Sequence, residues 1–183
     1  MDCFELIGLL IRPEARILLT DNYGRSVAVL REPSCDSEAT IYNVPDDAIV
    51  VKLDENLDLG RLFSGSFGEC KRSDFLVITE KNSKIIFVHI EIKLTRANAG
   101  DIQHQLRGSY CFVHYLRELG KAFAKHNTFL IQARHRFVSI RHTGPRKRKT
   151  KIERATGQND VPERAMKISS PYHIEFANIC GGI

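Results

Sequence analysis

Cysteine is scarce and unpaired in this chain of 183 residues. The five cysteines lie at positions 3, 35, 70, 111 and 180, an odd number with no C-x-x-C pair. This pattern argues against a disulfide framework. No basic stretch precedes the first apolar run, so we expect no secretory signal peptide. These absences together predict an intracellular, reducing compartment, the cytoplasm.

Long apolar runs and the common nucleotide-binding and hydrolase motifs are also missing. The apolar run at residues 6–11 (LIGLLI) is too short to cross a bilayer, so we interpret it as part of a buried helix and expect no membrane partner. The chain has no G-x-x-x-x-G-K phosphate loop and no G-x-S-x-G elbow, which argues against P-loop nucleotide hydrolysis and serine hydrolysis. Hydrophobic residues make up 43% of the chain, enough for a real core.

Two apolar runs in the middle of the chain predict a β-hairpin. They cover residues 74–79 (DFLVIT) and 85–93 (IIFVHIEIK), and the polar, turn-prone residues 81–84 (KNSK) separate them. A four-residue loop at this point pairs Glu80 with Ile85. The register of the hairpin then follows from that pair.

This register places Asp74 opposite Glu91, 17 residues later. Directly opposed residues on antiparallel strands have Cβ atoms about 4.5–5.5 Å apart. Two carboxylates that close repel each other unless a cation lies between them. Lys93 points to the same face as Glu91, because side chains alternate along a strand. Three charged groups are therefore predicted to converge at one end of an apolar hairpin.

An Asp, a β-turn and then Glu-x-Lys resembles the signature of the PD-(D/E)xK nuclease superfamily. Here the signature residues are Asp74 and the triplet at residues 91–93, and Ser73 stands where the signature has proline. The resemblance covers about residues 69–119, including a helix predicted after the triplet. It implies the restriction-endonuclease-like fold, an α/β fold with a central mixed β-sheet flanked by helices.

That helix is predicted from Ile102 to about Leu119, where apolar residues recur at helical spacing. Asp101 can cap its start. Many members of the superfamily carry a Gln early in this helix that reaches toward the active site. The resemblance gives that role to Gln103, with Gln105 as the alternative.

The resemblance also implies a metal-dependent nuclease that hydrolyses phosphodiester bonds. Hard divalent cations such as Mg²⁺, or Mn²⁺ in its place, prefer carboxylate and carbonyl oxygens. Asp74 and Glu91 would supply the carboxylates, and Ile92 its backbone carbonyl. Lys93 would hold or help to deprotonate the attacking water and stabilise the developing anion. Asp74, Glu91, Lys93 and Gln103 are therefore the expected catalytic residues.

Two points about this site stay open in the sequence. Some members of the superfamily use a further acid upstream of the hairpin, and Glu38 and Glu69 are both candidates. The plainer interpretation is that Asp74 begins a strand while Glu91 and Lys93 form an exposed ion pair, which contributes about 0–1 kcal/mol. That interpretation does not explain why the two acids should be opposed.

Positive charge is concentrated in residues 141–154, which contain seven basic residues and one acid. Without this segment the chain would carry a net charge of −1 instead of +5. Such a run attracts phosphate backbones without reading sequence, and the expected nucleic-acid-binding residues are Arg146, Lys147, Arg148, Lys149 and Lys151. There are two alternatives: a solvated loop that favours solubility, and a nuclear localisation signal in a eukaryote.

The rest of the chain completes a single predicted α/β domain, residues 1–183, with a flexible basic loop at about residues 141–165. A helix is expected near the N-terminus, ending near Pro13. Further strands are expected at residues 26–31, 39–44, 48–53, 128–133 and 172–177.

We therefore expect a Mg²⁺-dependent endonuclease whose partner is nucleic acid, DNA rather than RNA. Cutting a duplex needs two active sites, which suits a homodimer or a subunit of a larger complex. Two non-catalytic alternatives stay open. One is a nucleic-acid-binding or assembly module on the same fold, and the other is a small interaction protein whose basic segment meets an acidic partner.

Overall fold

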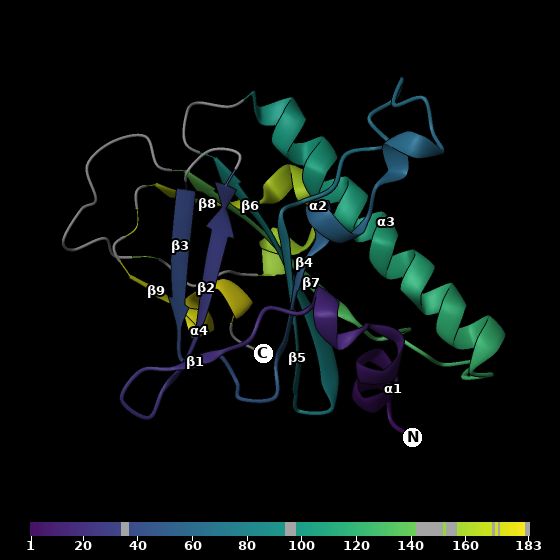
Figure 1. Cartoon of the computed structure of the whole chain (residues 1–183), viewed down its shortest axis with the longest axis horizontal. Helices are drawn as coiled ribbons and strands as arrows, with labels where there is room; N and C mark the ends of the chain where they lie inside the picture. The colour runs from purple at the N-terminus through teal and green to yellow at the C-terminus, as the bar shows by residue number, and fades with distance from the viewer. Residues whose placement is uncertain are drawn as a thin grey trace.

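The computed structural model describes residues 1–33, 37–93, 98–141, 152, 157–169, 171 and 173–181. Two β-sheets and several helices make up this part of the chain (Figure 1). The helices are α1 (Cys3–Leu10), α2 (Leu53–Asn56), α3 (Ala99–Phe123) and α4 (Phe176–Cys180), with short 3-10 turns at Pro13–Ala15, Leu59–Arg61, Gly157–Asp160 and Pro162–Arg164. The strands are β1 (Thr20–Asp21), β2 (Ser26–Glu32), β3 (Ser37–Tyr42), β4 (Ile49–Lys52), β5 (Phe75–Lys81), β6 (Lys84–Lys93), β7 (Arg134–Arg141), β8 (Met166–Ser169) and β9 (Ile174–Glu175).

The larger sheet is mixed, with the strand order β4-β5-β6-β7-β8. The pairs β4-β5 and β5-β6 are antiparallel, whereas the pairs β6-β7 and β7-β8 are parallel. Parallel neighbours need a crossover connection, and α3 supplies it between β6 and β7. The predicted α/β class with a mixed sheet is therefore confirmed.

The two faces of the larger sheet have different covers (Figure 1). On one face lie α1 and α3, and the buried cluster there includes Ile7, Val113 and Phe87. On the other face lie α4 and the smaller sheet, which has the order β1-β2-β3-β9. The prediction of one central sheet flanked by helices is thus correct for one face, and a second sheet shares the cover of the other.

The hairpin of β5 and β6 has the predicted register but a tighter turn. Glu80 pairs with Ile85 as expected, and Lys81 also pairs with Lys84, so the loop has two residues rather than four. These residues are Asn82 and Ser83, with φ of 51° and 57°. Two positive φ values in succession are typical of the type I′ turn, whose twist matches that of the strands.

Helix α3 starts earlier than predicted and approaches the chain ahead of β5 closely. Asn98, not Asp101, is its cap, because the Asn98 side chain accepts a hydrogen bond from the Gly100 N–H at 3.0 Å. Asp101 instead pairs with Lys71 at 2.6 Å. A Cβ at Gly108 would lie 1.7 Å from the carbonyl oxygen of Lys71, so only glycine allows this approach.

The later part of the chain departs most from the sequence prediction. Residues 128–133 form turns rather than a strand, and Phe129 and Leu130 are buried within them. The strand expected at residues 172–177 is reduced to β9 and is followed by α4, while β8 was not predicted. Of the expected basic loop, residues 142–151 and 153–156 lie outside the described residues.

Among the helices that the structure describes, none combines the length and apolar character needed to cross a bilayer.

Candidate metal centre

Asp74 and Glu91 lie next to each other at one end of the β5-β6 hairpin. Phe75 and Ile90 form the last β5-β6 pair at this end, so the register continues to Asp74 opposite Glu91, as predicted. The backbone N–H of Asp74 donates to Glu91 Oε2 at 3.2 Å, and the backbone N–H of Ile92 donates to Asp74 Oδ2 at 2.7 Å. Asp74 is 5% exposed and Glu91 is completely buried. The two acids are therefore close together and largely out of water.

Lys93 adds a positive charge to the pair. Its Nζ forms an ion pair with Glu91 Oε1, and its side chain keeps 27% of its surface exposed. Glu91 is not the partner in an exposed surface ion pair, because its own side chain is fully buried. The three charged groups expected to converge do so, with the ammonium group nearest to solvent.

The pKa values of the two acids are raised strongly. Burial raises the pKa of Asp74 to about 7, although the hydrogen bond from Ile92 and the charge of Lys93 oppose this. Burial and the charge of Asp74 raise the pKa of Glu91 to about 8, again against the effect of Lys93. The paired carboxyls therefore retain protons near neutral pH, and a bound cation would favour their ionised forms.

Two further acids lie beside Asp74, and the sequence prediction missed both. Glu32 at the end of β2, Asp54 in α2 and Asp74 each offer an oxygen, and these oxygens lie within 4.8 Å of one another. Asp54 is brought there because the Leu53 N–H donates to the Asp74 carbonyl at 2.9 Å. A sequence signal did exist: Glu32 and Asp54 each directly follow a predicted strand, and Glu91 lies near the end of another.

The two upstream acids that the sequence offered have other partners. Glu38 pairs with Arg31 at 2.8 Å. Glu69 accepts hydrogen bonds from the N–H groups of Gly65 at 2.9 Å and Phe67 at 2.8 Å, within the loop ahead of the hairpin. Neither belongs to the acidic group around Asp74.

The donor set of this centre fits a hard divalent cation. Carboxylate oxygens are the ligands that Mg²⁺ and Mn²⁺ prefer. The N–H and C=O groups of one residue in a strand point toward the same neighbouring strand. The Ile92 N–H points toward Asp74, so the Ile92 carbonyl points to that side as well. Asp74, Glu91 and the Ile92 carbonyl are thus the residues that would hold such an ion.

The other predicted site residues are less constrained. Gln103 and Gln105 lie in the first half of α3 and are half-buried, and no hydrogen bond within the described ranges joins either one to Asp74 or Glu91. The role of Gln103 stays a prediction. The proposed nucleic-acid-binding residues (Arg146, Lys147, Arg148, Lys149 and Lys151) lie outside the described residues.

A second buried polar group lies two residues before Glu91 on the same face of β6. His89 is completely buried, with its Nδ1 at 2.8 Å from Ser109 Oγ and its Nε2 at 3.0 Å from His135 Nδ1. Ser109 donates its hydroxyl proton to the Leu106 carbonyl, which leaves its oxygen to accept from His89. Burial lowers the pKa of His89 well below its usual value and that of His135 to about 4, so both rings are neutral.

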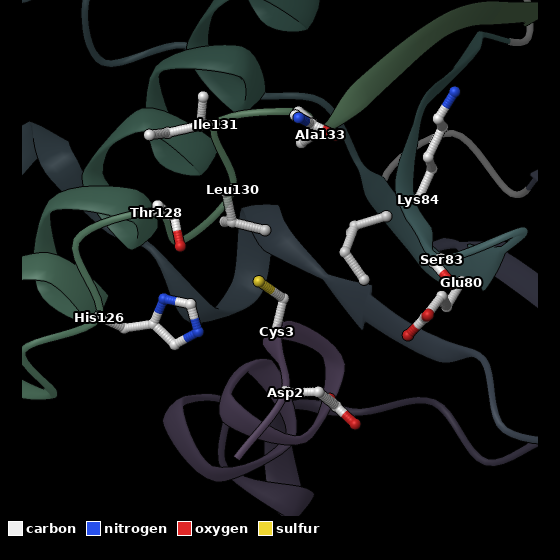
Figure 2. Close-up of a pocket in the computed structure, with 12 residues that line it drawn as sticks. Asp2, Cys3, Glu80, Ser83, Lys84, His126, Thr128, Leu130, Ile131 and Ala133 are labelled. Atoms are coloured by element: carbon white, nitrogen blue, oxygen red, sulfur yellow. The ribbon is translucent and has the colours of Figure 1, made fainter.

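Two cavities in the described part of the molecule lie apart from these acids. One, of about 510 Å³, lies at the turn end of the hairpin, with Cys3 of α1 and Leu130 in its wall (Figure 2). Another, of about 670 Å³, lies between residues 57–69 and α3 and is lined largely by apolar side chains, among them Phe63, Phe67 and Tyr115. Neither is lined by Asp74 or Glu91.

Compared with known proteins, the chain matches no family model, no curated protein and no solved structure. Its function must therefore be inferred from the chemistry of the site.

Proposed function

We propose that this protein is a metal-dependent nuclease of the PD-(D/E)xK type that hydrolyses phosphodiester bonds, with DNA as its substrate. One observation carries the proposal. Asp74 and Glu91 are buried side by side at the end of β6, with the ammonium group of Lys93 on Glu91. An ordinary ion pair needs one acid, whereas two adjacent buried acids suit a divalent cation.

The position of the site in the fold supports this proposal. The acids lie where β6 ends and the chain continues toward α3, at the carboxyl end of the parallel pair β6 and β7. In open α/β sheets, ligands bind outside the carboxyl ends of the strands. A mixed sheet with the Asp and the Glu-x-Lys triplet on adjacent strands is also what the resemblance implies.

Each side chain has a distinct part in the proposed chemistry. A bound divalent ion would act as a Lewis acid that lowers the pKa of a coordinated water and offsets negative charge. The N–H of Ile92 fixes the orientation of the Asp74 carboxylate. Lys93, partly exposed beside Glu91, can hold the attacking water and stabilise the anion that develops on the phosphate.

Basic residues 146–151 are proposed to hold the nucleic-acid backbone through charge alone, which gives affinity without sequence preference. Cleavage and binding would then depend on different residues. This separation makes the nuclease distinguishable from a module that only binds nucleic acid.

The test is cleavage of plasmid DNA and of DNA and RNA oligonucleotides by the full chain with Mg²⁺ or Mn²⁺, and with the metal chelated. Lys93→Ala should lower the cleavage rate by roughly 100- to 1000-fold, the loss typical of removing one group that stabilises the transition state. Asp74→Asn and Glu91→Gln should abolish it. All three variants should still bind nucleic acid.

Matched controls are available at the other end of the same hairpin. Glu80→Gln and Lys84→Ala make the same chemical changes at positions next to the turn, away from the acids. Both variants should cleave like the unaltered protein. Binding without any metal-dependent cleavage would refute the proposal and favour the non-catalytic module, and neither cleavage nor salt-dependent binding would favour a protein partner.

A further inference from the structure

Lys52 is a buried cation inside the acidic group that adjoins the candidate metal centre. It is 8% exposed, and its Nζ donates to Glu32 Oε2 at 2.8 Å and to the Arg31 carbonyl at 3.2 Å. Two more carboxylates lie close to the same nitrogen, Asp54 at 3.6 Å and Glu55 at 3.3 Å. The ammonium group therefore has oxygen partners from both β2 and α2.

The remaining surroundings of this ammonium group also favour a cation. Its nitrogen lies 5.1 Å from the centre of the Phe75 ring, within the range of a cation–π contact. Burial alone would lower the pKa of Lys52, but the hydrogen bond to Glu32 and the charge of Asp54 outweigh it and raise the pKa. Lys52 is thus a permanently charged group held by the fold.

Asp74 is close to two sets of charges. The first set is Glu91 and Lys93. The second is Glu32 and Asp54, each of which has an oxygen within 4.8 Å of an Asp74 oxygen. Many phosphodiesterases place two metal ions about 3.5–4 Å apart, held by acids on both sides of a shared carboxylate. Here the positive charge of Lys52 already offsets part of the negative charge of the second set.

We propose that Lys52 takes the place of a second metal ion, so that this centre binds one divalent cation, at Asp74 and Glu91. Glu32 and Asp54 then hold Lys52 and are not metal ligands. The inference rests on the proposed nuclease function, because it presupposes an ion at the first position. It makes Lys52 a positioning residue that fixes the charge next to Asp74.

The test counts bound Mn²⁺ on the full-length protein by calorimetry and electron paramagnetic resonance, with no substrate present. The unaltered protein should bind one ion. Lys52→Met keeps most of the side-chain volume but removes the charge, and it should bind two ions. Lys71→Met, which removes a surface lysine paired with Asp101, should still bind one.

A second variant keeps the test decisive if Lys52→Met does not fold. In the double variant Glu32→Gln with Asp54→Asn, the single ion should remain and its affinity should fall by less than about tenfold, the lower end of the loss seen when residues behind metal ligands are changed. Two ions on the unaltered protein, one ion on folded Lys52→Met, or loss of the ion from the double variant would each overturn the role of Lys52. Absence of any bound ion from the unaltered protein would instead refute the proposed nuclease function, and this inference with it.

Discussion

His89 and Glu91 occupy equivalent places on β6 and have opposite surroundings. They lie two residues apart on the same face, and both are completely buried. His89 is neutral, and both of its ring nitrogens are hydrogen-bonded to neutral partners. Glu91 faces a second acid, Asp74, and is paired with one ammonium group.

The difference between these two regions is the difference between buried polar groups that hold the fold together and buried acids that suit a bound cation. A buried polar group with all of its hydrogen bonds made holds elements together at little cost, and here it ties β6 to α3 and β7. Two adjacent buried acids are costly unless a cation is added. The histidine network is therefore complete within the chain, whereas under the proposed function a bound cation would complete the acid pair.

Replacing the buried polar side chain in each region should change the free energy of unfolding most. His89→Ala removes a packed ring and leaves hydrogen-bonding groups of the buried Ser109 and the half-buried His135 unpaired, so it should lower the free energy of unfolding by about 3 kcal/mol. Glu91→Gln keeps the volume and removes a charge that is costly without metal. At pH 8 in chelator, its free energy of unfolding should equal or exceed that of the unaltered protein, as measured by urea denaturation.

Equal destabilisation of the metal-free protein by both substitutions would contradict this difference between His89 and Glu91. With Mn²⁺ added, the order should change, because the ion stabilises only the protein that can bind it. The unaltered protein should then exceed Glu91→Gln in stability.

A second, smaller effect should appear in the pH dependence of stability without metal. The pKa values of Asp74 and Glu91 in the folded state are raised to about 7 and 8. Between about pH 4.5 and these values the folded state keeps protons that the unfolded chain has released, so the contribution of the two acids to stability falls as pH rises. The lowered pKa values of His89 and His135 act with the opposite sign below about pH 6.5. We expect near-cancellation from about pH 4.5 to 6.5, followed by a loss on the order of 2 kcal/mol by pH 8.

Chemical denaturation across this pH range, in chelator, measures that curve. Asp74→Asn should flatten the decline above pH 6.5, and His135→Phe should make stability fall across the lower range by removing part of the opposing effect. A free energy of unfolding that rises from pH 6.5 to 8 would contradict the raised pKa values of the two acids.

A third expected effect concerns a residue on which both regions depend. Gly108 precedes Ser109, the partner of His89, and it packs against Lys71 in the segment that leads to Asp74. Helix propensity alone predicts that alanine is better than glycine by about 1 kcal/mol. Gly108→Ala should instead destabilise by roughly 1–3 kcal/mol, because its Cβ would overlap the Lys71 carbonyl.

Gly8 in α1 is the matched control, since a Cβ added there meets no atom within 4 Å. Gly8→Ala should therefore raise the melting temperature, and Gly108→Ala should lower both the melting temperature and the affinity for Mn²⁺. Equal stabilisation by both substitutions would show that the approach of residue 71 to α3 is not required.

The hairpin and the acid pair were predictable from the sequence because the residues that determine them lie close together in the chain. The alternation of apolar residues and the polar turn fixed the pairing of Glu80 with Ile85, and every pair up to Asp74 and Glu91 follows from it. The turn length was wrong because Asn82 and Ser83 adopt positive φ, which shortens the loop without shifting the register.

The rest of the site depends on tertiary contacts that no local pattern carries. Glu32 belongs to the smaller sheet and reaches Asp74 only because the two sheets pack together. Residues 128–133 have the apolar content of a strand, but Leu130 has a φ of 56° and the segment packs as turns under α1 and α3. The need for Gly108 is likewise visible only once Lys71 lies against it.

The most direct test of the central claim is a crystal structure of the protein soaked with Mn²⁺, with the ion located by its anomalous scattering. One peak is expected, bridging the carboxylates of Asp74 and Glu91, with the Ile92 carbonyl also in contact. A structure without a peak at this position, or with its only peak elsewhere, would contradict it.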